Sequence, residues 1–146
     1  MTVNAPRYPL ATVGALVVGP SGRVLLTRTH KWRHRWSVPG GKIAYGESMR
    51  SALLREVREE TRLELTDVHW GPVQEAVQSE AFYRSAHFIL LNFIARSPSE
   101  VVTLNEEAQA FVWVAPEEAL GYDLNPPTKY LVDFYLEHGF STGVLA

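Results

Sequence analysis

The chain has 146 residues, of which 46% are hydrophobic and 21% charged, and its formal net charge is -2. This length and composition fit one globular domain, so we expect a single domain over residues 1–146. The slight negative charge argues against a nucleic-acid partner, because such proteins usually carry a basic excess. The chain has no cysteine, which excludes disulfides, zinc–thiolate sites and a cysteine nucleophile.

The N-terminal part predicts a loose arm over residues 1–8, followed by a β-hairpin. Leu10–Val18 is apolar and valine-rich, Gly19–Gly22 has turn residues, and Arg23–Thr29 alternates apolar and polar side chains. The apolar stretch from Pro9 is too short for a membrane span and lacks the charged start of a signal peptide. We therefore expect no membrane association and a cytoplasmic location.

The remaining pattern mixes strands and helices. Lys31–Trp36 predicts a basic, aromatic loop, and Val38–Gly41 predicts a glycine corner that precedes a helix from Glu47 to about Arg62. The later segments predict, in chain order, strands at Val68–Gln78 and His87–Arg96 joined by Ser79–Ser85, a strand at Ala110–Val114, a helical turn at Pro116–Leu120 and a helix at Thr128–His138. This order favours an α/β sandwich with a mixed sheet over a doubly wound fold.

The predicted helix from Glu47 places carboxylates on its core-facing side. At about 100° per residue, one broad side holds the apolar residues Met49, Ala52, Leu53, Leu54, Val57 and Leu63. Glu56 and Glu60 project near the middle of that side, and Glu59 projects at its edge. Burying carboxylates is costly without a compensating cation, and Mg²⁺ prefers oxygen ligands. The alternative is a solvated helix with weak surface ion pairs, as is common in glutamate-rich helices.

Residues 40–63, GGKIAYGESMRSALLREVREETRL, resemble the Nudix box. The box residues present at the required spacing are Gly41, Glu47, Arg55, Glu56, Val57, Glu59, Glu60 and Leu63. Arg62 stands where the family has glycine, at the predicted helix end, where a left-handed backbone favours a residue without a Cβ. We expect that the helix either runs on slightly or ends in another form of turn.

The resemblance implies a Nudix-type α/β/α sandwich with a mixed central sheet and a loop–helix–loop motif that binds Mg²⁺, with Mn²⁺ as an alternative. It implies metal ligation by Glu56, Glu60 and the Gly40 carbonyl, with Glu59 acting directly or through water. It also implies that Glu47 pairs with Arg55, which orients Glu56. The identity of the general base varies across the family and stays open between these carboxylates.

Further similarity lies outside the box. Arg28 matches a nucleotide-holding arginine of MutT-like members, and Glu107, six residues before Trp113, resembles their extra metal-binding glutamate. The segment GYDLNPPT, which contains Asn125, resembles the base-contacting region of the bacterial nucleoside triphosphatase branch. An Asn before Pro-Pro is also a routine turn residue. The remaining candidates are Arg33 and Arg35 for phosphate, and Trp32, Trp36, Phe82 and Tyr83 for the base or for plain packing.

The resemblance implies a small-molecule nucleotide substrate, most simply a nucleoside or deoxynucleoside triphosphate that is cleaved to monophosphate and pyrophosphate. Two alternatives stay open. One is hydrolysis of a nucleoside diphosphate sugar or a dinucleoside polyphosphate, since the box does not select the substrate. The other is a nucleotide-sensing module without turnover. The sequence does not distinguish a monomer from a homodimer.

Overall fold

The computed structural model describes residues 7–146, so most of the predicted N-terminal arm lies outside the described residues. Its elements, in chain order, are β1 (Leu10–Val18), β2 (Val24–Thr29), the 3₁₀ helix η1 (His30–Trp32), β3 (Arg35–Ser37), β4 (Gly40–Lys42), α1 (Met49–Thr61), β5 (Val68–Val77), β6 (His87–Arg96), β7 (Ala110–Val114), α2 (Pro116–Ala119) and α3 (Pro126–His138). Within residues 7–146, no helix is long and apolar enough to cross a membrane.

The strands form one mixed sheet of seven strands with the main order β3-β2-β1-β6-β5. The centre is a parallel pair, in which β1 runs alongside β6 from Leu10↔Phe88 to Val18↔Arg96. The other pairs are antiparallel: β2 with β1, β3 and β7, β6 with β5, and β4 with β1. Strands β1 and β2 diverge after their single paired position, which leaves room for β4 beside β1.

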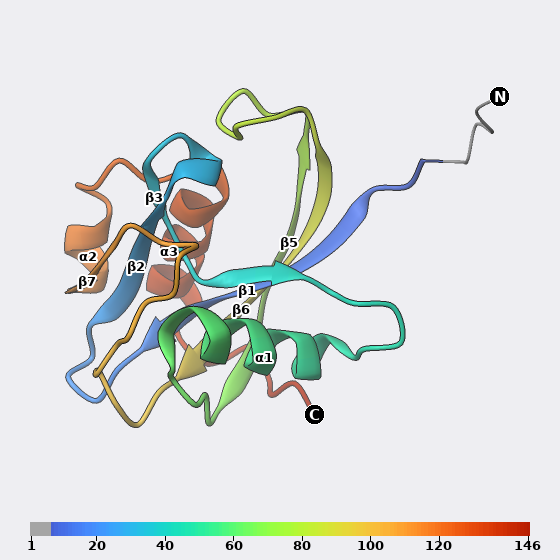
Figure 1. Ribbon diagram of the computed structural model, residues 1–146. Coiled ribbons are helices and arrows are strands. Elements are labelled where there is room, and N and C mark those ends of the chain that lie inside the picture. The colour runs from blue at the N-terminus through green and yellow to red at the C-terminus, as the bar shows by residue number, and fades with distance from the viewer. Residues whose placement is uncertain (1–6) are drawn as a thin grey trace, which may run out of the picture.

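Helices cover both faces of this sheet, as Figure 1 shows. Alternate side chains of β6 enter different cores, because successive strand residues point to opposite faces. Phe93 and Ala95 pack in the core that α1 covers, whereas Ile94 packs with Leu131 and Val132 of α3. The chain therefore has the α/β/α sandwich with a mixed central sheet that the sequence predicted.

The helix α1 begins one residue after Ser48, whose hydroxyl accepts a hydrogen bond from the Ser51 N–H. It ends at Thr61, and Arg62 takes the left-handed conformation with φ 64°. The expectation of a longer helix or a different form of turn is therefore wrong. The chain keeps the turn that a glycine would make and tolerates a Cβ there.

Two other expectations need correction. The predicted loop at Lys31–Trp36 is partly regular, because η1 ends at Trp32 and β3 begins at Arg35, paired with β2. The helix α3 begins at Pro126 and not at Thr128, with Asn125 as its N-cap. Proline fits the first helical turn, where its missing N–H would have no partner inside the helix.

Candidate active site

The carboxylates of α1 are directed as the helical projection predicted. Glu60 is 9% exposed and the Glu56 side chain 13% exposed, whereas the Glu59 side chain is 55% exposed. Glu56 and Glu60 therefore face the interior, and Glu59 lies at the edge. The burial of two ionisable groups on one helix face indicates that they have polar or charged partners, because such groups are seldom buried without one.

Glu107 joins these residues from the loop between β6 and β7. One carboxylate oxygen each from Glu56, Glu60 and Glu107 lies within 4.8 Å of the others. The Asn105 N–H donates to the Glu60 carbonyl at 3.4 Å, and the Glu107 N–H donates to the Asn105 side chain at 3.0 Å. These bonds hold the loop against the end of α1. Glu107 thereby lies beside the two α1 carboxylates that, like it, the resemblance implied as metal ligands.

Carboxylates at this separation repel one another when they are ionised. The pKa of Glu60 is raised to about 9, first by burial and next by the hydrogen bond with Glu107, and the hydrogen bond from the Gly40 N–H opposes this shift. Burial also raises the pKa of Glu56, against the effect of Arg55. A divalent cation would relieve this repulsion, and the donors are all oxygens, as Mg²⁺ prefers. The donor set thus fits a hard cation.

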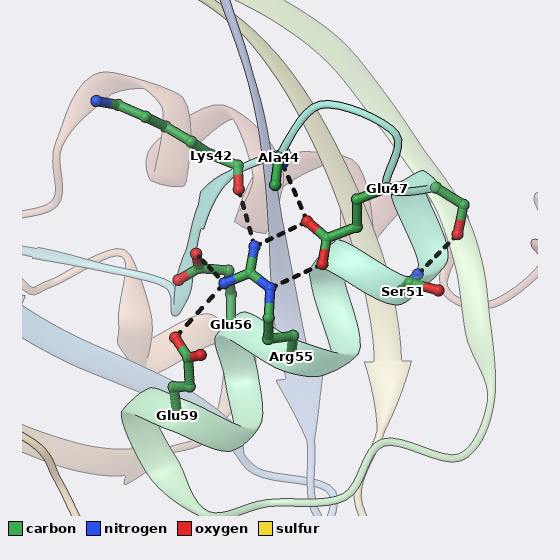
Figure 2. A network of polar contacts seen from close by, with 8 residues as sticks. Lys42, Ala44, Glu47, Ser51, Arg55, Glu56 and Glu59 are labelled. Atoms are coloured by element: carbon green, nitrogen blue, oxygen red, sulfur yellow. Dashed lines mark hydrogen bonds and ion pairs between the residues drawn. The ribbon is translucent and has the colours of Figure 1, made fainter.

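Arg55 connects the loop before α1 to the carboxylates (Figure 2). Its Nε and Nη2 donate to the two Glu47 oxygens at 2.7 and 2.9 Å, and its Nη1 donates to Glu56 at 2.9 Å. Further contacts reach the Lys42 carbonyl at 3.2 Å and Glu59 at 3.5 Å. The hydrogen bonds from Arg55 and then from the Ala44 N–H lower the pKa of Glu47 to about 2. These are the contacts that the predicted pairing of Glu47 with Arg55 requires.

The glycine corner packs directly on these carboxylates. The Gly40 N–H donates to Glu60 at 2.8 Å. A methyl group on Gly40 would overlap the backbone of Val13, and one on Gly41 would overlap the Glu56 carboxylate. Gly40 therefore requires glycine for close backbone approach, whereas a side chain at Gly41 would displace the Glu56 carboxylate. The predicted metal contact of the Gly40 carbonyl stays a prediction.

A cavity of about 330 Å³ opens beside the carboxylates, and Glu56 and Glu107 contribute to its lining. Its apolar wall is made by Val38, Trp32, Phe82, Tyr83, Phe88 and Leu90. Basic side chains also line it, namely Lys31, Lys42 and Arg84. Its neutral polar lining includes Ser37, Asn92, Asn125 and Thr128. Apolar walls with a few polar groups and an acidic cluster are typical of a small-molecule site.

The predicted arginines lie outside this cavity lining. The buried Arg28 Nε has no hydrogen-bond partner among residues 7–146, and the Arg28 guanidinium lies 5.6 Å from the centre of the Trp36 ring. Arg35 forms an ion pair with Asp123 at 3.8 Å. Trp36 packs edge-on against Tyr122, in agreement with the packing alternative. Any contact of Arg28 or Arg35 with a nucleotide stays a prediction.

Asn125 lies in the cavity wall but is engaged in capping α3. Its side-chain oxygen accepts from the Thr128 N–H at 2.9 Å, and its amide nitrogen donates to the Ser37 hydroxyl at 3.3 Å. The residue is 2% exposed. This geometry matches the turn-residue alternative, while a role in base contact is untested.

The lining residues that the sequence did not single out include Lys31, Lys42, Arg84 and Asn92. Three of them are ordinary basic residues of loops and strand ends, for which the sequence has no distinguishing signal. Asn92 does have one, because it is the single polar residue between Phe88 and Ala95 in an otherwise apolar strand. A polar residue within an apolar strand is unusual enough to be noted.

Comparisons with known proteins agree with this geometry. The model of the NUDIX domain matches residues 9–134. The nucleoside triphosphatase NudI of Escherichia coli strain K12 is 33% identical over 101 residues, which cover 65% of this chain and 72% of that protein.

Solved structures show the same fold at lower identity. A MutT Nudix hydrolase from Burkholderia pseudomallei superposes with a TM-score of 0.76 at 23% identity, covering 88% of this chain and 98% of that chain. The Nudix domain of NrtR from Shewanella oneidensis, in complex with ADP ribose, gives a TM-score of 0.75 at 17% identity, covering 90% and 88%. With the family match over most of its length, the box and the glutamate cluster, this chain belongs to the Nudix family and is a Nudix hydrolase.

Proposed function

We propose that this hydrolase cleaves nucleoside triphosphates to the monophosphate and pyrophosphate with the help of Mg²⁺, for which Mn²⁺ can substitute. The observation that carries the proposal is the convergence of Glu56, Glu60 and Glu107 beside a cavity of about 330 Å³. The similarity to NudI, which is named a nucleoside triphosphatase, supports the substrate class. Small-molecule sites commonly have cavities of about this size.

The residues present suit the charge of such a substrate. Glu56, Glu60 and Glu107 would hold the cation, with Glu59 and the Gly40 carbonyl as further ligands. A divalent cation supplies charge neutralisation on phosphoryl oxygens and lowers the pKa of water. Lys31, Lys42 and Arg84 line the same cavity and would oppose the phosphate charge.

Proton transfer in our proposal uses the carboxylate of Glu56. This carboxylate lines the cavity and accepts a hydrogen bond from Arg55, which Glu47 holds from its other side. Arg55 therefore orients Glu56, and Glu56 removes a proton from the water that attacks phosphorus. The bond between phosphorus and the bridging oxygen then breaks, and pyrophosphate leaves. No covalent intermediate is needed.

The test is Glu56→Gln, which keeps the size of the side chain and removes its charge. We expect turnover of nucleoside triphosphates to fall by about 10²–10⁴-fold, the usual contribution of a general base. Glu118→Gln is the matched control, because Glu118 is exposed on α2 and should keep wild-type turnover. Turnover of Glu56→Gln equal to that of the wild type, with the melting temperature unchanged, would contradict the proposal.

The substrate class is tested by product analysis. The wild-type enzyme with Mg²⁺ should release pyrophosphate from nucleoside triphosphates. Release of sugar phosphate from a nucleoside diphosphate sugar, or cleavage of a dinucleoside polyphosphate, at higher kcat/KM would favour the alternative substrates. A chain that binds nucleotides and cleaves none of them would be a sensing module.

A further inference from the structure

Asn92 is a buried amide in the wall of the cavity. It lies on β6, is 7% exposed, and shares its strand face with Phe88 and Leu90, which also line the cavity. These residues occupy alternate strand positions, so their side chains form one row. The next residue in the row, Ile94, enters the core that α3 covers. Asn92 therefore lies where the apolar row of the cavity wall meets the closed core.

The Asn92 amide differs in its hydrogen bonding from Asn125 and Ser37, two other buried polar residues of the wall. The Asn125 side chain bonds to the Thr128 N–H and to Ser37, and the Ser37 hydroxyl also donates to the Val38 carbonyl. The Asn92 side chain makes no hydrogen bond to any other residue within 7–146. Buried polar side chains are nearly always paired in native proteins, because an unpaired one costs about 1–3 kcal/mol. Among residues 7–146 the fully enclosed side-chain atoms without a partner are Arg28 Nε and His69 Nδ1, so the Asn92 amide is open to the cavity that it lines. Its partner there would be water or a molecule bound in the cavity.

The backbone around Asn92 is irregular on one side and open on the other. On β5, Trp70 pairs with Phe93 and Val73 pairs with Leu91, so Gly71 and Pro72 together lie opposite Asn92 in a bulge. Bulges redirect side chains and are frequent beside active sites. On β1 the partner of Asn92 is Gly14, where an added Cβ would lie 3.0 Å from the Asn92 side-chain oxygen. The missing side chain of Gly14 thus leaves space for the Asn92 amide.

We propose that Asn92 determines base specificity in this hydrolase by hydrogen bonding to the edge of the nucleobase, while Phe88 and Leu90 contact the ring. This inference rests on the proposed function. An amide presents one acceptor and two donors, which match the paired donors and acceptors along a base edge. The neighbouring apolar side chains exclude water, and exclusion of water strengthens such bonds.

The variant Asn92→Asp changes the hydrogen bonds that can form while keeping the shape. An ionised carboxylate only accepts, so it loses every hydrogen bond that the Asn92 amide donates to a base. It keeps the bonds that the side chain accepts from amino groups and ring N–H groups, which differ among the four bases. At about pH 8, where carboxyl groups are ordinarily ionised, we expect at least one affinity ratio among AMP, CMP, GMP and UMP to change about tenfold or more. Repulsion of phosphate by the new charge is common to all four ligands and cancels in these ratios.

The variant Asn92→Leu distinguishes a role of the amide in nucleotide binding from a role in fold stability. Replacing an amide that has no partner among residues 7–146 by an apolar side chain of similar size should leave the melting temperature equal or raise it. Binding of the four monophosphates should weaken by about tenfold, the discrimination typical of a bidentate contact to a base. Gln74→Leu is the matched control, because the Gln74 amide has a partner and donates to the Pro127 carbonyl at 3.1 Å. That variant should melt lower and keep the wild-type affinity ratios.

The readout is equilibrium binding of AMP, CMP, GMP and UMP, which does not require hydrolysis. A change of all four affinities by one common factor in Asn92→Asp would overturn the inference. So would failure of the wild type to bind any of the four, or a lower melting temperature of Asn92→Leu with binding intact. If a ratio shifts as expected but the wild type hydrolyses no triphosphate, only the proposed function fails.

Discussion

The Arg55 guanidinium donates hydrogen bonds to different groups on its different sides. Glu47 accepts two hydrogen bonds from it, Glu56 accepts one, and the Lys42 carbonyl accepts another. Because a guanidinium is planar, these contacts fix both its position and its orientation. Arg55 thereby fixes Glu56 relative to the strand that carries the glycine corner.

Glu47 gives this contact a pH dependence. The pKa of Glu47 is lowered to about 2 from its ordinary value of 4.5, chiefly by the hydrogen bonds from Arg55. A lowered pKa contributes stability that is complete above the ordinary value and is lost as the pH falls toward the lowered one. We therefore expect the urea midpoint of Glu47→Gln to be below that of the wild type at pH 7.

The difference in midpoint should shrink as the pH falls from about 4.5 toward 2. Urea denaturation of both proteins across this range measures it. A difference that stays constant with pH would show that the charge of Glu47 is not its source.

The sequence predicted some residues of the site from local patterns and did not predict others. Glu56 and Glu60 follow from helical periodicity, which needs no knowledge of the rest of the fold. Glu107 followed only from similarity in its spacing from Trp113, and the structure brings it to the other two. Lys42 enters the cavity because strands far apart in the sequence meet there, and no local pattern carries that information. Asn92 stands out locally as a polar residue in an apolar stretch, but only the strand pairing brings it to the cavity.

At the scale of elements, the end of α1 departs from the usual preference. Arg62 adopts φ 64°, and a left-handed backbone costs a residue with a Cβ roughly 1–2 kcal/mol. We expect Arg62→Gly to raise the free energy of unfolding by roughly 0.5–1 kcal/mol, after the greater freedom of glycine in the unfolded chain is subtracted.

Ser51→Gly is the control for this change, because Ser51 is exposed within α1 and has no positive φ. Glycine in a helix should lower the free energy of unfolding there by about 0.5–1 kcal/mol. Chemical denaturation measures both variants. Destabilisation by Arg62→Gly would mean that contacts of the arginine outweigh its backbone cost.

The elements that the sequence missed are short. The strands β3 and β4 have three residues each, too few for an alternating pattern to appear. Both form because they pair with longer strands, β2 and β1 respectively. The longer elements, such as β6 and α1, were predicted within about two residues at each end because their periodicity extends over ten or more residues.

At the scale of the whole molecule, the acidic cluster joins segments that are distant in the sequence. Glu56 and Glu60 belong to α1, and Glu107 belongs to a loop that follows β6. A cation bound by all three would bind the folded chain and not the unfolded one, so it would stabilise the fold by mass action. We expect added Mg²⁺ to raise the melting temperature of the wild type.

Glu107→Gln should require a higher Mg²⁺ concentration for half of this increase, because it removes one ligand and keeps the side-chain size. Glu106→Gln is the matched control, since Glu106 is exposed and outside the cluster. Melting curves across a Mg²⁺ titration provide the measurement. Equal midpoints for Glu107→Gln and the wild type would remove Glu107 from the metal site.

The fold class could be predicted from the order of elements and from the resemblance, but the strand order could not. Nothing local in Leu10–Val18 indicates that its central partner is β6, or that β4 pairs on its other edge. The tertiary packing of the two helical layers decides these pairings. The predicted single domain over residues 1–146 and the cytoplasmic location stay predictions.

The parallel pairing of β1 with β6 also has a consequence for biosynthesis. Leu10 pairs with Phe88, and Val18 pairs with Arg96. The central strand pair of the sheet therefore forms only after the ribosome has added β6, more than halfway along the chain. Until then the valine-rich first strand has an unpaired edge, and unpaired edges favour aggregation. Closing so long a loop also slows folding. A nascent chain stalled before β6 should therefore depend on chaperones, whereas the finished chain can protect that edge itself.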